Sequence, residues 1–557
     1  MRNKKWLLLI ASLIVVMFLA ACSGSDSSDT DSGEEESNET DSSSGDEESE
    51  RAASSADNVN KEGFPIVKEE IDLTFFTGKY EPNLDDYEET LVFKTYAEQT
   101  GVNVTFDEVP FGTLTEKRNL ALASGEYSDV FYSARIPAAD LYTYGQQGIF
   151  VPLNDLIDEY APNLKAVMEK HPDIKKGLTM PDGNIYSVPS YYSPEFLPML
   201  IGKPIWVKDS WLEQLDMEEP KTIDDFYAYL KAVSETDLNG NGENDEIPFS
   251  ASNVNQIVNS IKGAWGLGTR GVGHTYVDID PETDELRFTR TDDKYKEMLE
   301  FVNKLYTEGL IDQEIFTMDD SKLNAKGSQG VLGTAIVPNP ETVFTDQDDY
   351  IGLGSLEGPH GDNLYSHVKT PLVHVGAFAI TDKNEHPEAT LRWIDHFFSD
   401  EGAAFQFMGI EGETYEVTED GEFEFFEEIT NNPDGLTFDQ ALTPYVTWMG
   451  GSYPGYVQEK YFKGSESLPS AIEVGEKVAP NAPEEIWNGF NYTDDELDFK
   501  QTTGADLHTY IGEMEAGFIS GDISFSEWDN YVEQVKEMGQ DEYLEVEKAA
   551  YERYQES

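Results

Sequence analysis

The 557-residue chain contains one cysteine, Cys22, so no disulfide can form within it. Basic residues are also scarce, because 38 Lys and Arg stand against 109 Asp and Glu and give a formal net charge of −71. A protein this acidic repels the phosphates of nucleic acids and anionic membrane surfaces. We therefore expect no nucleic acid among its partners.

Familiar catalytic motifs are absent or misplaced. The eight histidines form no HExxH pattern, and the sequence contains no GxSxG nucleophile elbow. Residues 266–271 spell GxGxxG, but they follow no clear strand and lead into Gly273-His-Thr-Tyr rather than a helix. With so many carboxylates, a glycosidase pair could be drawn almost anywhere, so spacing in sequence carries no information about it. The sequence predicts no enzyme activity.

The chain has no long apolar run apart from its N-terminus. Residues 1–22 begin with a basic stretch and continue with an apolar segment, 6–19, that is too short to span a bilayer. This pattern is typical of a secretory signal peptide. It ends in Leu-Ala-Ala-Cys22, which resembles the lipobox of bacterial lipoproteins. The resemblance implies that Cys22 is acylated and that this lipid alone attaches the protein to the outer face of the cell membrane, an extracytoplasmic location.

The next segment, residues 23–60, is rich in Ser, Gly, Asp and Glu, with thirteen acidic residues against one arginine. Such a segment cannot bury enough apolar surface to fold, so we predict a disordered stalk. The remaining ~500 residues exceed what one hydrophobic core normally supports. We expect two compact lobes.

The first part of the folded region alternates strands and helices. Apolar residues alternate at 71–75 and 102–106, and Asp129-Val-Phe-Tyr132 suggests a third strand; the segments 91–96 and 113–124 between them have helical character. This order predicts a parallel α/β sheet, whose ligands gather at the loops after the strand C-terminal ends. Those loops contain Lys79, Tyr80 and Tyr132. The chain closes with amphipathic helices, as the apolar spacing at 528–535 indicates.

One dense cluster of oxygen donors indicates a metal site, at residues 237–246. The spacing of its donors matches positions 1, 3, 5, 7 and 9 of an EF-hand loop, with Gly242 at the sharp turn. Pro248 stands where a bidentate Glu is expected, so Glu246 would have to turn back as the last carboxylate. The alternative is a solvated polar turn. We predict a structural Ca²⁺ held by Asp237, Asn239, Asn241, Glu243, Asp245 and Glu246.

Several further segments form a recognisable set. Residues 122–131, Leu-Ala-Ser-Gly-Glu-Tyr-Ser-Asp-Val-Phe, are similar to an ASGxxPD family motif, with Ser128 in place of proline. Others are Asp182-Gly-Asn-Ile-Tyr186, Gly376-Ala-Phe-Ala-Ile380, His386-Pro-Glu-Ala389, Gly409-Ile-Glu-Gly-Glu-Thr-Tyr415 and Phe518-Ile-Ser-Gly521. With them, nearly the whole chain after the stalk resembles the extracellular solute-binding lipoproteins of bacterial ABC importers, in the family 1 group that includes oligosaccharide and alginate binders.

The resemblance implies a type II periplasmic-binding-protein fold, in which two discontinuous α/β lobes close on a ligand in the cleft by hinge motion. We expect crossings near 186–193 and 372–377. The predicted first lobe comprises 61–190 and 331–375, and the predicted second lobe comprises 191–330 and 376–557. The implied function is capture of an oligosaccharide for an ABC transporter permease by a monomeric binder, with calcium in the matching loop of the alginate-binding relatives.

A sugar cleft needs aromatic faces and a few polar groups. Loop and hinge positions suggest the aromatic candidates Tyr80, Tyr132, Tyr191, Trp265 and Trp448. The scarce basic residues Lys79, Arg135 and Arg270 would suit uronic-acid sugars, or they merely pair with surface carboxylates. Two other classes stay open. One is a secreted, lipid-anchored polysaccharide-processing enzyme, and the other is a peptide-binding or adhesion lipoprotein.

Overall fold

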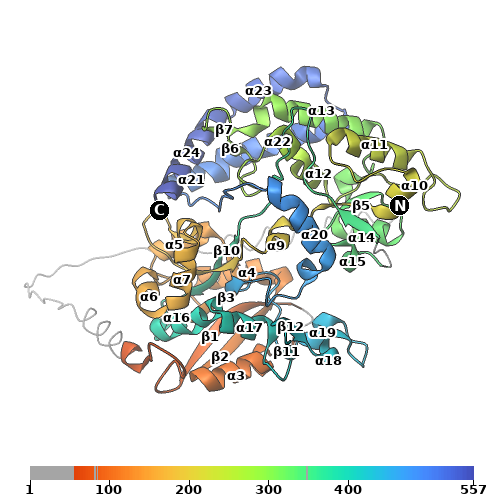
Figure 1. Ribbon diagram of the computed structural model, residues 1–557. Coiled ribbons are helices and arrows are strands. Elements are labelled where there is room, and N and C mark those ends of the chain that lie inside the picture. The colour runs from red at the N-terminus through yellow and green to blue at the C-terminus, as the bar shows by residue number, and fades with distance from the viewer. Residues whose placement is uncertain (1–54, 81–82, 85, 346–348) are drawn as a thin grey trace, which may run out of the picture. The chain divides into compact units, whose positions relative to one another are not determined.

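The computed structural model describes residues 55–80, 83–84, 86–345 and 349–557 (Figure 1). Cys22, the predicted signal peptide and nearly all of the predicted stalk lie outside the described residues. The predictions made for them stay predictions.

A six-stranded sheet joins strands from both predicted segments of the first lobe. Its strand order is β13-β4-β10-β3-β1-β2. In it, β1 pairs in parallel with β2 and β3, β10 runs antiparallel to both β3 and β4, and β13 is parallel to β4. The strands are β1 (Ile71–Lys79), β2 (Val102–Pro110), β3 (Val130–Ile136), β4 (Val188–Tyr192), β10 (Leu372–Ile380) and β13 (Gly455–Val457).

The predicted strand-helix alternation at the start is confirmed. Helix α3 (Leu91–Thr100) joins β1 to β2, and α4 (Leu114–Ser124) joins β2 to β3. Both helices end at a glycine with left-handed backbone, Gly101 at φ 73° and Gly125 at φ 76°, where a side chain would be strained. Because β1, β2 and β3 are parallel, their C-terminal ends meet at one edge of the sheet. Of the residues predicted to bind ligand from these loops, Tyr80 directly follows β1, whereas Lys79 ends β1 and Tyr132 lies inside β3.

A second sheet has three strands in the order β8-β5-β9. Helices cover this region, and α22 packs against α13 (Figure 1). The predicted amphipathic helices at the C-terminus are confirmed, because Trp528, Tyr531 and Val535 of α23 are buried. The strands are β5 (Ile205–Lys208), β8 (Thr334–Ile336) and β9 (Tyr350–Gly352), and the last three helices are α22 (Ala505–Ser520), α23 (Trp528–Glu537) and α24 (Gln540–Glu556).

The remaining strands and helices complete the described structure. Two further hairpins are β6 (Val277–Ile279) with β7 (Leu286–Phe288) and β11 (Tyr415–Val417) with β12 (Phe423–Phe425). The other α-helices are α5 (Ala138–Gln146), α6 (Asn154–Tyr160), α7 (Pro162–Lys170), α8 (Asp173–Leu178), α9 (Leu197–Ile201), α10 (Asp209–Leu215), α11 (Ile223–Ser234), α12 (Val254–Ile261), α13 (Asp293–Thr307), α14 (Asp320–Ser328), α15 (Pro340–Val343), α16 (Pro387–Asp395), α17 (Asp400–Met408), α18 (Glu427–Thr430), α19 (Phe438–Leu442), α20 (Pro469–Val478) and α21 (Asp494–Phe499).

The predicted lobe boundaries are wrong at two places. Strand β8 lies in 331–375, assigned to the first lobe, but it pairs with β5 of the three-stranded sheet. Most of β10 and all of β13 lie in 376–557, assigned to the second lobe, but both belong to the six-stranded sheet. The chain therefore returns to the six-stranded sheet at β10, and leaves it again after β13 for α20, which packs against β9. Strands of three residues carry too little pattern for the sequence to indicate their partners.

Close packing of β10 against β3 makes Gly376 a sensitive position. A Cβ at Gly376 would lie 2.2 Å from the Ile136 carbonyl oxygen in the neighbouring strand. Because that obstacle is backbone, we expect Gly376→Ala to lower the free energy of unfolding by about 1–3 kcal/mol, measured by urea denaturation. Gly512→Ala is the control, since nothing lies within 4 Å of its added Cβ in α22. Equal stability of the two variants would contradict the prediction.

Candidate functional site

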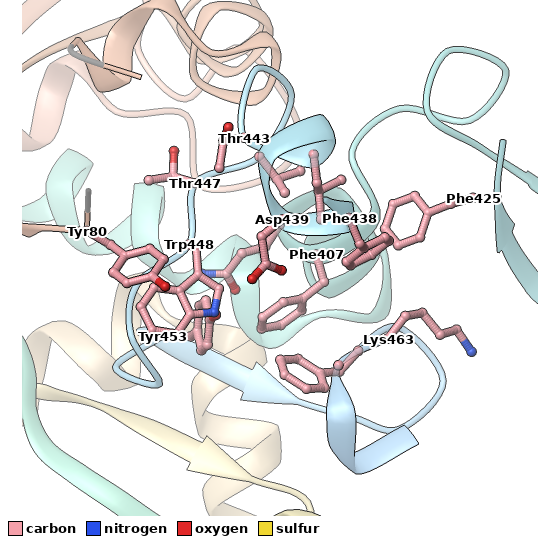
Figure 2. A pocket seen from close by; sticks show the side chains of 15 residues that line it. Tyr80, Phe407, Phe425, Phe438, Asp439, Thr443, Thr447, Trp448, Tyr453 and Lys463 are labelled. Atoms are coloured by element: carbon pink, nitrogen blue, oxygen red, sulfur yellow. The ribbon is translucent and has the colours of Figure 1, made fainter. Parts of the chain in front are cut away.

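An aromatic pair stands at the C-terminal edge of the parallel strands. Tyr80 directly follows β1, and Trp448 comes from the loop before β13. Their ring centroids lie 4.0 Å apart at an interplanar angle of 46° (Figure 2). Asn83 fixes this arrangement, because its Nδ2 donates to the Trp448 carbonyl at 2.8 Å and its Oδ1 accepts from the Trp448 N–H at 3.1 Å. Two segments far apart in sequence thus form one aromatic surface.

The pair borders a hollow of about 610 Å³ that is partly open to solvent. In the view of Figure 2, Asp439 lies between the rings of Trp448 and Phe407, and Lys463 lies beyond Phe407, away from Trp448. Most of the wall is apolar, with a few polar groups among the rings, as in sites that bind sugars. We call it the aromatic hollow. Its lining residues are Tyr80, Gln406, Phe407, Phe425, Phe438, Asp439, Leu442, Thr443, Val446, Thr447, Trp448, Tyr453, Phe462, Lys463 and Gly464.

Arg135, at the end of β3, lies beside this hollow. Its Nη2 donates to the Gly450 carbonyl, two residues after Trp448, and its guanidinium lies 4.7 Å from the Phe111 ring centroid. The Phe111 ring in turn contacts Trp448 edge to face, with the centroids 6.5 Å apart. Burial lowers the pKa of the Arg135 guanidinium below its usual value. The guanidinium of Arg135 is therefore a basic group in contact with the residues that adjoin the aromatic surface.

Lys79 is near the same edge but is paired. Its Nζ lies 3.1 Å from Glu108 Oε2 on β2. Burial raises the pKa of Glu108, although the Tyr87 N–H and the Lys79 ammonium both favour its charged form. Arg270 is paired as well, because its Nε lies 3.3 Å from Glu485 Oε2 and its guanidinium faces the Trp487 ring at 6.0 Å. Lys79 and Arg270 therefore pair with carboxylates, which is the alternative that the sequence left open for them.

Three predicted ligand aromatics lie in the core instead. Tyr132, Tyr191 and Trp265 are only 1%, 0% and 2% exposed. Tyr132 packs among aromatic rings that include Phe75, Tyr191 hydrogen-bonds Asp173 at 3.3 Å, and Trp265 packs on Phe301. The prediction that they face ligand is therefore wrong for this structure. A position near a loop in the sequence does not determine whether the side chain points into the core or toward solvent.

The sequence reasoning missed most of the hollow. Phe407 comes from α17, Asp439 from α19, and Tyr453 and Lys463 from the loops around β13. The available signal was the glycine-rich stretch 448–453, with aromatic residues at both ends. It identified Trp448 but not Tyr453 or the helices that complete the wall.

The predicted calcium loop follows α11 and is held by its own side chains. Asp237 accepts hydrogen bonds from the Gly240 and Gly242 N–H groups at 2.8 and 3.0 Å, and Gly242 has a left-handed φ of 86°. Glu246 turns back onto the start of the loop, where its Oε1 accepts from the N–H groups of Leu238 and Asn239. The loop thus brings its first and last carboxylates to the same end of the segment.

The donor atoms of this loop are oxygens, the type of ligand that calcium prefers. Glu246 Oε2 is buried and has no hydrogen-bond partner within the described residues. The amides of Asn239 and Asn241 both donate to Asp245 Oδ1, which lowers the pKa of that carboxyl. Hard oxygen donors of this type suit Ca²⁺. In the part of the chain that the structure describes, no three His, Cys, Asp or Glu side chains converge at metal-binding distance, so binding would require the loop carboxylates to move together.

Comparisons with known proteins point in one direction. Residues 81–404 match the family model described as bacterial extracellular solute-binding protein. The fructooligosaccharide ABC transporter substrate-binding protein FusA of Streptococcus pneumoniae is 29% identical over 517 residues, which cover 88% of this chain and 92% of FusA. A solved FusA structure, an EF-hand mutant in complex with fructo-nystose, is 26% identical with a TM-score of 0.69 and covers 87% of this chain and 99% of FusA. An extracellular solute-binding protein from Bifidobacterium longum subsp. infantis is 22% identical, has a TM-score of 0.72, and covers 87% of this chain and 98% of its own.

Proposed function

Because the chain belongs to the bacterial extracellular solute-binding protein family, we propose that it captures an oligosaccharide outside the cell and delivers it to an ABC transporter. The fold is the two-lobe α/β fold of the solute-binding proteins. The observation that carries the proposal is the Tyr80–Trp448 pair beside a largely apolar hollow, since sugar rings stack their C–H faces on such surfaces. The relative FusA, a fructooligosaccharide transporter's substrate-binding protein, supports the same class of ligand.

The mechanism follows from the two sheets and the segments that join them. A ligand that contacts both lobes stabilises the closed form over the open form by its differential affinity. The aromatic hollow holds the sugar rings, and the polar groups around it bind the hydroxyls. The permease subunits of the transporter would then recognise the closed, loaded monomer.

Binding without conversion is the test of this proposal. Purified protein is titrated calorimetrically with neutral and acidic oligosaccharides and with peptides, and every oligosaccharide that binds is then incubated with it and analysed for released sugars. We expect at least one oligosaccharide to bind and to be recovered unchanged. Release of shorter sugars would favour the polysaccharide-processing enzyme, and binding of peptides alone would favour the adhesion lipoprotein. No observation in the structure favours either alternative.

Calcium in the 237–246 loop is part of the proposal as a structural ion. Asp237, Asn239, Asn241, Asp245 and Glu246 would supply side-chain oxygens, and Glu243 its carbonyl. Support comes from the buried, unpartnered Glu246 Oε2 and from the relative FusA, one of whose solved structures is that of an EF-hand mutant. The ion would order the loop and neutralise its carboxylates.

Attachment through Cys22 completes the proposal. Within the described residues, no helix combines the length and the apolarity needed to cross a bilayer. An acylated Cys22 would keep the binder at the outer face of the membrane. We expect Cys22→Ser to be released into the medium by cells that retain the unaltered protein, as an immunoblot of cell and medium fractions would show. Equal retention of both proteins would contradict the anchor.

A further inference from the structure

We propose that four side chains in or shortly after β1, β3 and β4 are positioning residues for the sugar site: they hold the loop 448–451 in one conformation, so that Trp448 is in place before the sugar binds. The four are Asn83, Ser133, Arg135 and Tyr192. This inference rests on the proposed function, in which Trp448 is half of the aromatic pair. For Arg135 it specifies a role that needs no contact with the sugar.

Each of four consecutive backbone carbonyls in this loop accepts a hydrogen bond from a different side chain. From the start of the loop to its end, the donors and the residues whose carbonyls accept are Asn83 Nδ2 with Trp448 at 2.8 Å, Ser133 Oγ with Met449 at 3.4 Å, Arg135 Nη2 with Gly450, and the Tyr192 hydroxyl with Gly451 at 2.7 Å. Because the donors approach from separate strands, any shift of the loop as a unit lengthens at least one of these hydrogen bonds.

The loop needs such support because two of its residues are glycines with left-handed backbone, Gly450 at φ 59° and Gly451 at φ 80°. Glycine has more conformational freedom than any other residue, so an unsupported Gly-Gly pair would let Trp448 sample several positions. A Cβ added at Gly450 would lie 2.7 Å from Arg135 Nη2 and 2.8 Å from the Phe111 ring. The neighbours that exclude a side chain at Gly450 therefore also confine its backbone.

Strand β3 is distorted where it supplies two of the donors. Ser133 and Arg135 both have a left-handed φ of 52°, a conformation that costs free energy for any residue other than glycine. The register of β3 with β10 shifts at the same place, between Gly376 and Phe378 of β10. Irregularities of this type bend a strand and redirect its side chains, often next to a binding site. The distortion thus lies where β3 contacts the loop.

Arg118 of α4 stabilises the distorted backbone. It is 3% exposed, and its Nη1 donates to the carbonyls of Ala134 and Arg135 at 3.1 and 2.6 Å. Its Nη2 lies 3.8 Å from Asp140 Oδ2 on α5. Backbone strain persists only where the surrounding structure holds it in place. A buried arginine therefore offsets part of the strain in the segment that directs Ser133 and Arg135 toward the loop.

The backbone of Trp448 is fixed on both sides of its side chain. Asn83 engages its N–H as well as its carbonyl, and the next three carbonyls are bound in turn. The indole ring itself borders the aromatic hollow. A binding surface that is ordered before the ligand arrives gives higher affinity, because the entropy of ordering it is not lost on binding. Loosening the loop should therefore weaken every sugar that stacks on Trp448.

The first test needs no sugar. Hydrogen–deuterium exchange of the peptide 446–453 is followed by mass spectrometry in the full chain, in Tyr192→Phe and in Arg135→Met. We expect the loop to exchange about fivefold faster in both variants, because each loses one anchored carbonyl. Tyr96→Phe is the matched control, since the Tyr96 hydroxyl also donates to a carbonyl at 2.7 Å, that of Trp393, but in the core. Unchanged loop exchange in both variants would overturn the inference.

The second test measures affinity. Trimers of fructose, galactose, mannose and galacturonic acid are titrated calorimetrically, and the tightest binder is then titrated into the variants. We expect binding to weaken about threefold in Tyr192→Phe and about tenfold in Arg135→Met, with most of the affinity recovered in Arg135→Lys, which keeps a donor. Arg392→Met is the control and should bind normally, because Arg392 is a buried arginine that donates to the Gly63 carbonyl instead.

A double-mutant cycle separates positioning from direct contact. In a Trp448→Ala background the loop no longer presents an aromatic face, so Arg135→Met should weaken binding less than about twofold. The same tenfold loss in both backgrounds would show that the Arg135 guanidinium itself binds the sugar, and the positioning role would be wrong. Unchanged affinity in both single variants would overturn the inference and leave the proposed function standing. Binding of none of the trimers would contradict the proposed function and, with it, this role.

Discussion

Replacement of Trp448 by alanine is expected to weaken oligosaccharide binding about 30-fold or more, a loss of about 2 kcal/mol. The indole supplies one face of the aromatic pair, with its centroid 4.0 Å from that of Tyr80, and it borders the hollow. Removing it takes away the apolar surface on which a sugar ring stacks. Titration calorimetry with the best ligand of the screen measures the effect.

Two variants separate binding from folding in this experiment. Trp448→Phe keeps an aromatic face and should recover most of the affinity. Trp265→Ala removes a tryptophan that is buried in the core, so it should lower the melting temperature and leave the affinity of the folded protein unchanged. If Trp448→Ala binds as tightly as the unaltered protein, the aromatic hollow is not the sugar site.

Calcium is expected to stabilise the protein by about 2–3 kcal/mol when present at a hundred times its dissociation constant. The stabilisation arises because the ion binds the ordered 237–246 loop and relieves repulsion among its carboxylates. A calcium titration of the melting temperature, with chelator as the zero point, measures it. Asp237→Ala should abolish the response, since Asp237 is the first donor and also accepts from Gly240 and Gly242.

The control for this second prediction is Asp280→Ala. Asp280 also accepts a hydrogen bond from a backbone N–H in a turn, that of Glu282 at 2.8 Å, but it lies outside the loop. That variant should keep the full response to calcium. A melting temperature of the unaltered protein that is the same in calcium and in chelator would argue for a solvated polar turn.

Local patterns predicted local structure well. The alternation at 71–75 and 102–106, with a helical stretch between, specified β1, α3 and β2, and Gly101 marks the end of that helix. The donors of the 237–246 loop and the turn of Glu246 toward its start were also readable, because all of these contacts lie within ten residues. Such features depend on backbone geometry and on neighbours close in sequence.

Residues in the site were harder to predict. Tyr80 and Tyr132 were both expected in loops after parallel strands, yet Tyr80 borders the hollow and Tyr132 is buried within β3. Arg135 and Arg270 were both expected in loops, yet Arg135 lies in β3, and of the two only Arg270 meets a carboxylate within ion-pair distance in the described structure. Which outcome holds depends on the residues that pack against each side chain, and these come from distant segments.

The sequence by itself determined the family of the protein, its acidic charge, the opening α/β pattern and the oxygen-donor loop, because each is a property of composition or of short spacing. Only the tertiary structure decided that β10 and β13 complete the first sheet and that Trp448 meets Tyr80. Those contacts join residues tens to hundreds of positions apart. Chain folding alone brings them together, and no local pattern encodes the pairing.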